Sequence, residues 1–175
     1  VADPALAGAT TYTVSVDPTL TDVTGSVLEN APAFTFTTVG PEVTIVTPQN
    51  TAERIAPTTP ITITFNMPMD PTGVEGALSL SAGDATVSYT AEWHEENRTV
   101  VLTPDEMLPL GSTVTLTVGA AAPAANGGAT MDGDYGSTFD TVPFPAVLST
   151  TPADGGVADT WQRGFNVEFA SPMND

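Results

Sequence analysis

The sequence predicts an all-β protein of short antiparallel strands, and three observations lead to this prediction. First, apolar residues alternate with threonine or serine in short runs, as in strands with one buried and one solvent-facing side. Second, 16 prolines and 15 glycines interrupt these runs, which disfavours long helices. Third, a group of motifs recurs at a spacing of about 100 residues. One apolar face per strand is typical of antiparallel sheets packed face to face.

Two copies of a proline-containing motif define the repeat. In the first copy Thr47-Pro48 precedes a strand-like segment, 61–66, and in the second Thr151-Pro152 precedes the segment 165–170. Every matched pair of residues in these two copies is 104 apart. Chance does not readily give such regular spacing, so the two copies are interpreted as equivalent parts of successive units.

Two further pairs of segments extend the repeat toward the other end of the unit. They are 11–16 with 113–118, offset by 102, and 36–39 with 139–142, offset by 103. We therefore expect three parts: residues 1–40 as the C-terminal part of one repeat, 41–143 as a complete repeat, and 144–175 as the N-terminal part of the next. On this division both ends of the chain cut through a repeat.

The complete unit contains seven expected strands, at 42–46, 60–66, 77–81, 85–93, 98–103, 112–118 and 137–142. Seven short strands in about 100 residues match an immunoglobulin-like β-sandwich. The residues from Pro71 to Ala77, after Asp70 as a possible cap, are the one place for a short helical turn. Glu95-Glu96-Asn97 is expected to form a tight hairpin connection, and the stretch from Gly119 to Gly136 a long loop.

Each partial repeat should supply two strands, which leaves edges without a partner. We therefore predict that the partial repeats pair with each other, within one chain or between chains, in addition to contacts between neighbouring repeats.

The charge balance excludes two classes of partner. Against 21 acidic residues the chain has three basic ones, all arginine, and a formal net charge of −18. Nucleic-acid and membrane-surface binding both need clustered lysine and arginine, so neither partner is expected. No stretch approaches the 18 apolar residues of a membrane span, and no membrane insertion is expected. There is no cysteine, and hence no disulfide framework or thiol nucleophile.

Catalytic motifs are absent from the sequence. His94 is the only histidine, so any Ser-His-Asp set would have to use it, and it sits beside the expected hairpin turn. No nucleophile elbow, phosphate-binding loop or dinucleotide-binding motif is present. The chain is therefore not expected to be an enzyme, and His94 is interpreted as a structural residue.

Asp132 and Asp134 are the candidate metal ligands. They flank Gly133 in the long loop, and alternate carboxylates on a flexible loop can converge on Ca²⁺. The alternative is a solvated acidic turn, because the further acidic spacing of an EF-hand is missing. No cofactor other than calcium is expected.

Two tryptophans raise the alternative of a sugar-binding surface. Trp93 shares its expected strand face with Val87 and Tyr89, which favours a core position over a ligand platform. Trp161 lies in a turn before the last strand and would be exposed if its partner strands are absent. The Pro-Met turns that contain Met67, Met69 and Met173 are read as sandwich-edge residues or as a soft contact between units.

Taken together, these motifs resemble a known family. Thr47-Pro48, the segment 60–66, the Pro68-Met69-Asp70 turn and the closing Phe139-Asp140-Thr141 are similar to the bacterial Ig-like domain of S-layer and other surface proteins. The third part has Pro152-Ala153-Asp154-Gly155 where the complete unit has Pro48-Gln49-Asn50-Thr51.

The resemblance implies a tandem module outside the bacterial cell that acts as a spacer, stalk or protein-interaction surface. Similar domains also form the Ig-like region of bacterial alpha-macroglobulin-like protease inhibitors. A Phe-Xaa-Xaa-Pro-Met turn, such as Phe65 to Met69 here, is familiar in that region. The alternative is a carbohydrate- or calcium-binding adhesion module with a glycan partner.

Overall fold

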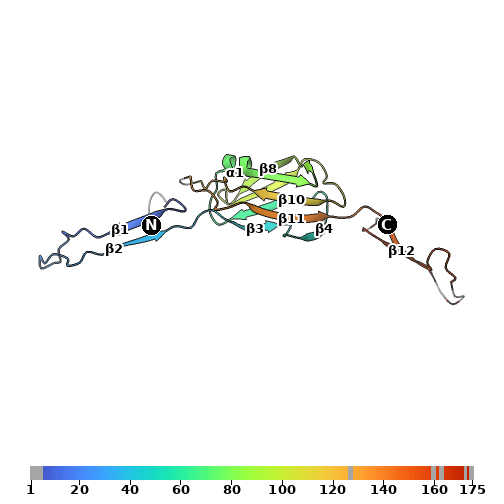
Figure 1. The fold of residues 1–175 in the computed structure, drawn as a ribbon, viewed down its shortest axis with the longest axis horizontal. Coiled ribbons are helices and arrows are strands. Elements are labelled where there is room, and N and C mark those ends of the chain that lie inside the picture. The colour runs from blue at the N-terminus through green and yellow to red at the C-terminus, as the bar shows by residue number, and fades with distance from the viewer. Residues whose placement is uncertain (1–5, 126–127, 159–160, 162–163, 172, 174–175) are drawn as a thin grey trace.

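The structure, a computed structural model, describes residues 6–125, 128–158, 161, 164–171 and 173. A β-sandwich occupies the middle of an elongated molecule, and one β-hairpin extends from each end of it (Figure 1). The single helix of this described part is the seven-residue α1 (Pro71–Ala77), where the sequence predicts a short turn. The all-β prediction is therefore confirmed. No helix in the described ranges is long and apolar enough to cross a membrane.

The central sandwich consists of two mainly antiparallel sheets. The four-stranded sheet has the order β3 (Val43–Thr47), β5 (Ile61–Phe65), β9 (Thr99–Pro104) and β8 (Tyr89–His94). The five-stranded sheet has the order β4 (Ala52–Ile55), β11 (Tyr135–Thr141), β10 (Thr113–Val118), β6 (Leu78–Ala82) and β7 (Ala85–Thr86). Every pairing in these sheets is antiparallel except β4 with β11.

The core lies between the two sheets and follows the predicted alternation. Every second residue of β5 and of β10 is at most 2% exposed: Ile61, Ile63, Phe65, Val114, Leu116 and Val118. Burial of each such side chain contributes about 1.5–3 kcal/mol to folding. Val74 from α1 is fully buried in the same cluster, so the short helix covers one end of the core.

Two features of the central sandwich differ from the sequence prediction. Strand β4 is absent from the prediction, because its sequence, Ala52-Glu53-Arg54-Ile55, lacks alternation. The predicted strand 85–93 is two strands in different sheets, β7 and β8, because the chain crosses between the sheets at Val87 and Ser88. Its unbroken alternation concealed this crossing.

The turn at residues 95–97 agrees with the prediction. Glu95, Glu96 and Asn97 all have φ between +52° and +64°, and together they reverse the chain between β8 and β9.

A two-stranded hairpin lies toward each end of the chain. The N-terminal hairpin consists of β1 (Thr11–Ser15) and β2 (Ala33–Thr37), and the C-terminal hairpin of β12 (Val147–Thr151) and β13 (Asn166–Phe169). In the described residues no strand of one hairpin pairs with the other, and the two lie at opposite ends of the molecule (Figure 1). Pairing between chains stays a prediction.

The C-terminal hairpin has the same register as β3 and β5. Val147 pairs with Phe169 as Val43 pairs with Phe65, and the same irregularity in register follows both pairs. The next backbone bond also recurs, since Ala170 N donates to Ala146 O at 2.8 Å as Asn66 N donates to Glu42 O at 3.0 Å. The turns that follow β3 and β12 have similar backbone angles at matching residues, since Thr51 has a φ of +63° and Gly155 a φ of +70°. The sequence difference in this turn therefore leaves the left-handed backbone at its fourth residue unchanged.

The N-terminal hairpin has the same register as β10 and β11. Thr11 pairs with Thr37 as Thr113 pairs with Asp140, and the four following pairs match in order. A threonine closes both hairpins in the same way. The Thr38 hydroxyl donates to Ala7 O and the Thr141 hydroxyl to Pro109 O, both at 2.6 Å.

Candidate functional site

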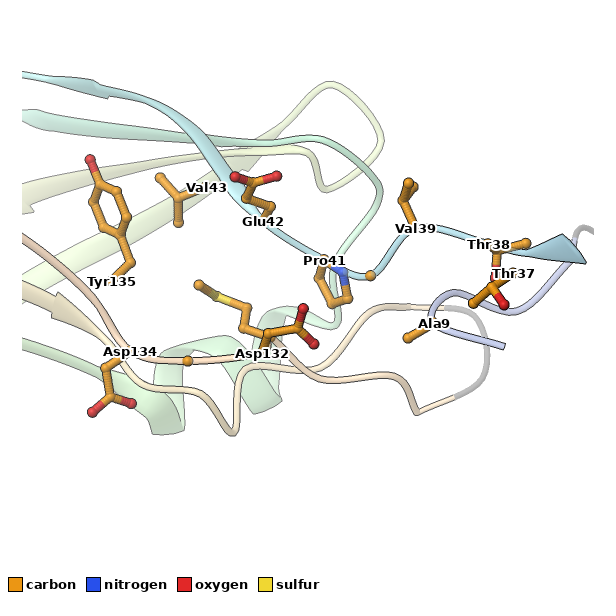
Figure 2. A pocket seen from close by; sticks show the side chains of 13 residues that line it. Ala9, Thr37, Thr38, Val39, Pro41, Glu42, Val43, Asp132, Asp134 and Tyr135 are labelled. Carbon is orange, nitrogen blue, oxygen red and sulfur yellow. The ribbon is translucent and has the colours of Figure 1, made fainter. Parts of the chain in front are cut away.

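A groove at the junction between the N-terminal hairpin and the sandwich is the first candidate site. Its volume is about 750 Å³. Three parts of the chain line it: Ala9, residues 37–43 and residues 131–135 (Figure 2). We call it the junction groove. It carries three carboxylates, from Glu42, Asp132 and Asp134, and no basic side chain.

Asn66 holds the wall of the junction groove in place. Its side-chain amide donates to Gly40 O at 2.9 Å, and its Oδ1 accepts from Glu42 N at 3.0 Å. On the hairpin side, Ala9 N donates to Val39 O at 3.0 Å. These bonds pair Val39 O, Gly40 O and Glu42 N, so the segment between β2 and β3 is hydrogen-bonded to both parts.

The predicted calcium ligands lie in the groove lining but do not converge. Asp132 and Asp134 are both exposed, and Figure 2 shows the Asp134 carboxylate directed away from Asp132. Asp134 Oδ1 accepts a hydrogen bond from Ala120 N at 2.7 Å, which ties together the two ends of the long loop. Within the described residues, no group of three potential metal ligands is found. Calcium binding stays a prediction, and the structure gives Asp134 a structural role.

Trp93 occupies the core-facing position that its strand pattern favours. It is half-buried, its ring stacks on Phe65 with centroids 6.3 Å apart, and its Nε1 donates to Glu75 Oε1 at 2.8 Å. Tyr89 lies on the same strand face, and burial together with the Glu75 charge raises the pKa of its hydroxyl. This cluster fixes α1 to β8, which explains the aromatic side chains without a ligand. Trp161 is 86% exposed, and a glycan partner stays a prediction.

His94 lies at an exposed position at the end of β8. Its Nε2 is 4.0 Å from Glu92 Oε2, and its carbonyl accepts a hydrogen bond from Arg98 N. Both contacts are local ones that accompany the hairpin turn. They give His94 the structural role that its sequence position suggests.

The two methionines of the turn Met67-Pro68-Met69 have different environments. Met69 is fully buried in the sandwich core. Met67 is half-buried and, together with Gly8 and Val39, lines a smaller groove at the N-terminal junction. The turn thus serves both as a sandwich edge and as a contact to the preceding hairpin.

The second junction uses a residue that sequence reasoning missed. Arg54 Nη1 donates to Ala170 O at 3.1 Å, which connects the central sandwich to the C-terminal hairpin. Arg54 is one of only three basic residues, which is a signal that could have marked it. Asn66 was also missed as a junction residue, although it directly follows the matched strand.

Comparison with known proteins identifies the central part. A family model described as "bacterial Ig-like domain" matches residues 39–141. No curated protein matches the chain.

Solved structures with a similar fold come from different kinds of protein. The S-layer protein SbsC is 20% identical over 64% of this chain and 15% of its own, with a TM-score of 0.44. Escherichia coli alpha-2-macroglobulin is 18% identical over 63% of this chain and 7% of its own, with a TM-score of 0.46. Mycobacterium tuberculosis L,D-transpeptidase 1 is 23% identical over 58% of this chain and 38% of its own, with a TM-score of 0.40. The matched part is therefore a minor portion of each of these proteins.

Proposed function

The chain belongs to the bacterial Ig-like domain family, and we propose that it is a non-enzymatic extracellular module that acts as a spacer, stalk or protein-interaction surface. In this proposal it forms part of a bacterial surface or secreted protein and consists of repeats of about 100 residues. The family match and the formal charge of −18 both support an exposed, soluble module.

The observation that carries the proposal is the end-to-end arrangement of equivalent hairpins. The C-terminal hairpin has the register of β3–β5, and the N-terminal hairpin has the register of β10–β11. The two hairpins extend from opposite ends of the central sandwich (Figure 1). Units that follow one another in this way increase length without forming a common core, as expected of a spacer.

The junctions support a spacer that resists bending. Only five residues, 38–42 and 142–146, separate the central sandwich from each hairpin. Asn66 is hydrogen-bonded to the first of these linkers, and Val142 N in the second donates to Ile55 O at 3.0 Å. Arg54 adds a bond across the second junction. Short linkers whose backbone groups are hydrogen-bonded to the neighbouring parts restrict rotation between them.

Small-angle X-ray scattering tests the spacer. The chain should give the distance distribution of a rod, and insertion of a flexible Gly-Ser segment after Gly40 should broaden it. Asn66→Ala should broaden it less, because this change removes only the two side-chain bonds at the first junction. A compact distribution for the unmodified chain, or no response to the insertion, would contradict a stiff spacer.

The extracellular location and the binding of glycans or calcium need separate tests. Protease treatment of intact cells should release fragments of this module if it lies outside the cell, whereas protection until lysis would contradict an extracellular role. A glycan array and a calcium titration address the alternative of an adhesion module. Binding in either would favour the alternative over a plain spacer.

The parent protein can be classified by one reaction. Labelled methylamine opens the internal thioester that protease-trapping macroglobulins carry, a motif that needs cysteine and is absent from this chain. Labelling of the intact parent at a Cys-Gln pair would assign the module to such an inhibitor. Without labelling, an S-layer or adhesin stalk is favoured, and a protease-binding test then addresses inhibitors without a thioester.

A further inference from the structure

The chain enters and leaves the central sandwich at opposite ends. It enters through the linker 38–42 and leaves through the linker 142–146 (Figure 1). The first strand after the entry is β3, and the last strand before the exit is β11. A pull along the molecule therefore acts on β3 and on β11 in opposite directions. The resistance of the sandwich to such a pull depends on how these two points are joined.

Strand β4 joins the entering segment to the exit strand. It follows β3 after residues 48–51 and pairs in parallel with β11. The register pairs Ala52 with Phe139 and Ile55 with Thr141. Because parallel neighbours run in the same direction, a pull on the start of β3 and on the end of β11 slides β4 and β11 past each other.

Hydrogen bonds extend this pairing on both sides of β4. Before the strand, Thr51 N donates to Thr138 O at 2.7 Å, and Thr138 N donates to Asn50 Oδ1 at 2.9 Å. After the strand, Val142 N donates to Ile55 O at 3.0 Å. The Asn50 side chain thus acts as one more acceptor in line with the strand. We call the paired segments 50–55 and 138–142 the clamp.

The pair β3–β5 is loaded in the same direction. A pull on β3 along its own axis slides it over the antiparallel β5, whose residues Ile61, Ile63 and Phe65 are anchored in the core. The strands β3 and β5 belong to the four-stranded sheet, whereas β4 and β11 belong to the five-stranded sheet. The entering segment is therefore held by both sheets.

The direction of the pull decides how the bonds between two strands fail. When strands slide past each other, all the bonds between them are strained together, whereas peeling strains and breaks them one at a time. A single hydrogen bond contributes little net stability, so resistance to force depends on how many are loaded at once. The clamp places its bonds in the sliding arrangement for a pull along the molecule.

We propose that the central sandwich bears tension along the molecule and that the clamp between β4 and β11 sets its resistance to unfolding under load. This role goes beyond that of a spacer, because a spacer that only sets a distance need not resist a pull. It follows from the topology of the central sandwich and from the two points at which the chain enters and leaves it. The stiffness of the junctions and the parent protein do not affect it.

Single-molecule force spectroscopy of the whole chain tests the clamp through the direction of the pull. The sequence has no native cysteine, so handles can be attached at chosen cysteine pairs. A Val39→Cys, Pro145→Cys variant is pulled along the molecule from exposed positions in the two linkers. A Val39→Cys, Gly133→Cys variant is pulled at one end, because both residues line the junction groove. A Cβ at Gly133 meets no atom within 4 Å, so the cysteine fits there.

The two variants should unfold at different rates under the same load. The lengthwise pull must break several clamp bonds together, whereas the pull at one end peels strands apart bond by bond. At equal load the lengthwise variant should therefore unfold at least about tenfold more slowly, as expected if only one or two more bonds break in the same step. Equal unfolding rates in the two directions would overturn the proposal.

Asn50→Ala tests the contribution of one clamp bond, since it removes the acceptor for Thr138 N. Under a lengthwise load it should speed unfolding about 2- to 12-fold, the range given by one hydrogen bond that is lost before the transition state. The matched control is Thr90→Val, which removes a hydrogen bond to Asp105 Oδ1 at 2.9 Å outside the clamp. Asn50 and Thr90 are both exposed, and the control should stay within about twofold of the unmodified rate.

The comparison of directions leaves the clamp residues unchanged, so it remains valid if Asn50→Ala does not fold. An unchanged loaded rate for Asn50→Ala, or an equal acceleration by Thr90→Val, would overturn the role of the clamp. The stiff spacer and the clamp fail separately. A compact scattering profile together with slow lengthwise unfolding would reject the spacer and support the clamp, and a rod that unfolds equally fast in both directions would do the reverse.

Discussion

The hydroxyl of Thr141 should contribute measurably to the stability of the central sandwich. Its side chain is 3% exposed, donates to Pro109 O at 2.6 Å and accepts from Ser112 N at 3.0 Å. Thr141→Val keeps the shape and removes both bonds. At about 0.5–1.5 kcal/mol per bond, the variant should lose about 1–3 kcal/mol. For a unit of this size a loss of about 2 kcal/mol lowers Tm by roughly 8–16 °C, which calorimetry or thermal circular dichroism resolves.

Two control variants separate the hydroxyl from other effects. Thr141→Ser keeps the oxygen and loses one methyl, so it should cost about 0.8 kcal/mol. Thr38→Val removes the matching bonds to Ala7 O and from Thr10 N in the N-terminal hairpin, outside the sandwich core. It should leave the main unfolding transition within about 0.5 kcal/mol of wild type. If the valine variant at 141 is as stable as the serine variant, the closing threonine does not act through its hydrogen bonds.

Three further predictions concern separate parts of the molecule. Ile63→Ala, at a fully buried position, should lower the free energy of unfolding in urea by about 2–5 kcal/mol, and a loss below about 1 kcal/mol would mean that the core is packed differently. Hydrogen bonds from Thr24 and from the Ser26 backbone lower the pKa of Asp22 below 3.8, so NMR titration should place its midpoint below that value. The hydrogen bonds that the Asp22 carboxylate accepts from Thr24 and Ser26 therefore stabilise their loop above pH 3.8, and this stabilisation is lost as the pH falls through the lowered pKa of Asp22. A titration midpoint at the ordinary aspartate value would contradict these hydrogen bonds. Asp134→Ala should destabilise the long loop by about 1 kcal/mol whether or not calcium is present, because it removes the bond from Ala120 N, and hydrogen exchange at Ala120 measures the effect.

Local patterns were sufficient to predict most of the central fold. Alternation located β5 and β10 because one side of each strand is buried and the other is not, and this contrast is present in the sequence itself. The same rule failed at Val87, where the alternation continues while the chain passes from one sheet to the other. Strand β4 is held by its parallel pairing with β11, a contact between segments far apart in the chain, so its own residues carry little signal.

The geometry of the candidate site was harder to predict from the sequence, for a related reason. Spacing alone placed Asp132 and Asp134 on one loop, but it could not give the direction of either carboxylate. The bond from Ala120 N to Asp134 crosses the whole loop and decides that direction. Asn66 and Arg54 likewise act on backbone groups of other parts of the chain, Gly40 and Ala170.

The matching registers of the hairpins allow some contacts between distant segments to be predicted. Once two segments share a register, the environment of one predicts the contacts that the other lacks. Phe165 matches the fully buried Ile61, yet it is 84% exposed, and neither alternation nor composition explains that difference. An apolar side chain at a position that is buried in the equivalent unit indicates that a partner surface belongs there.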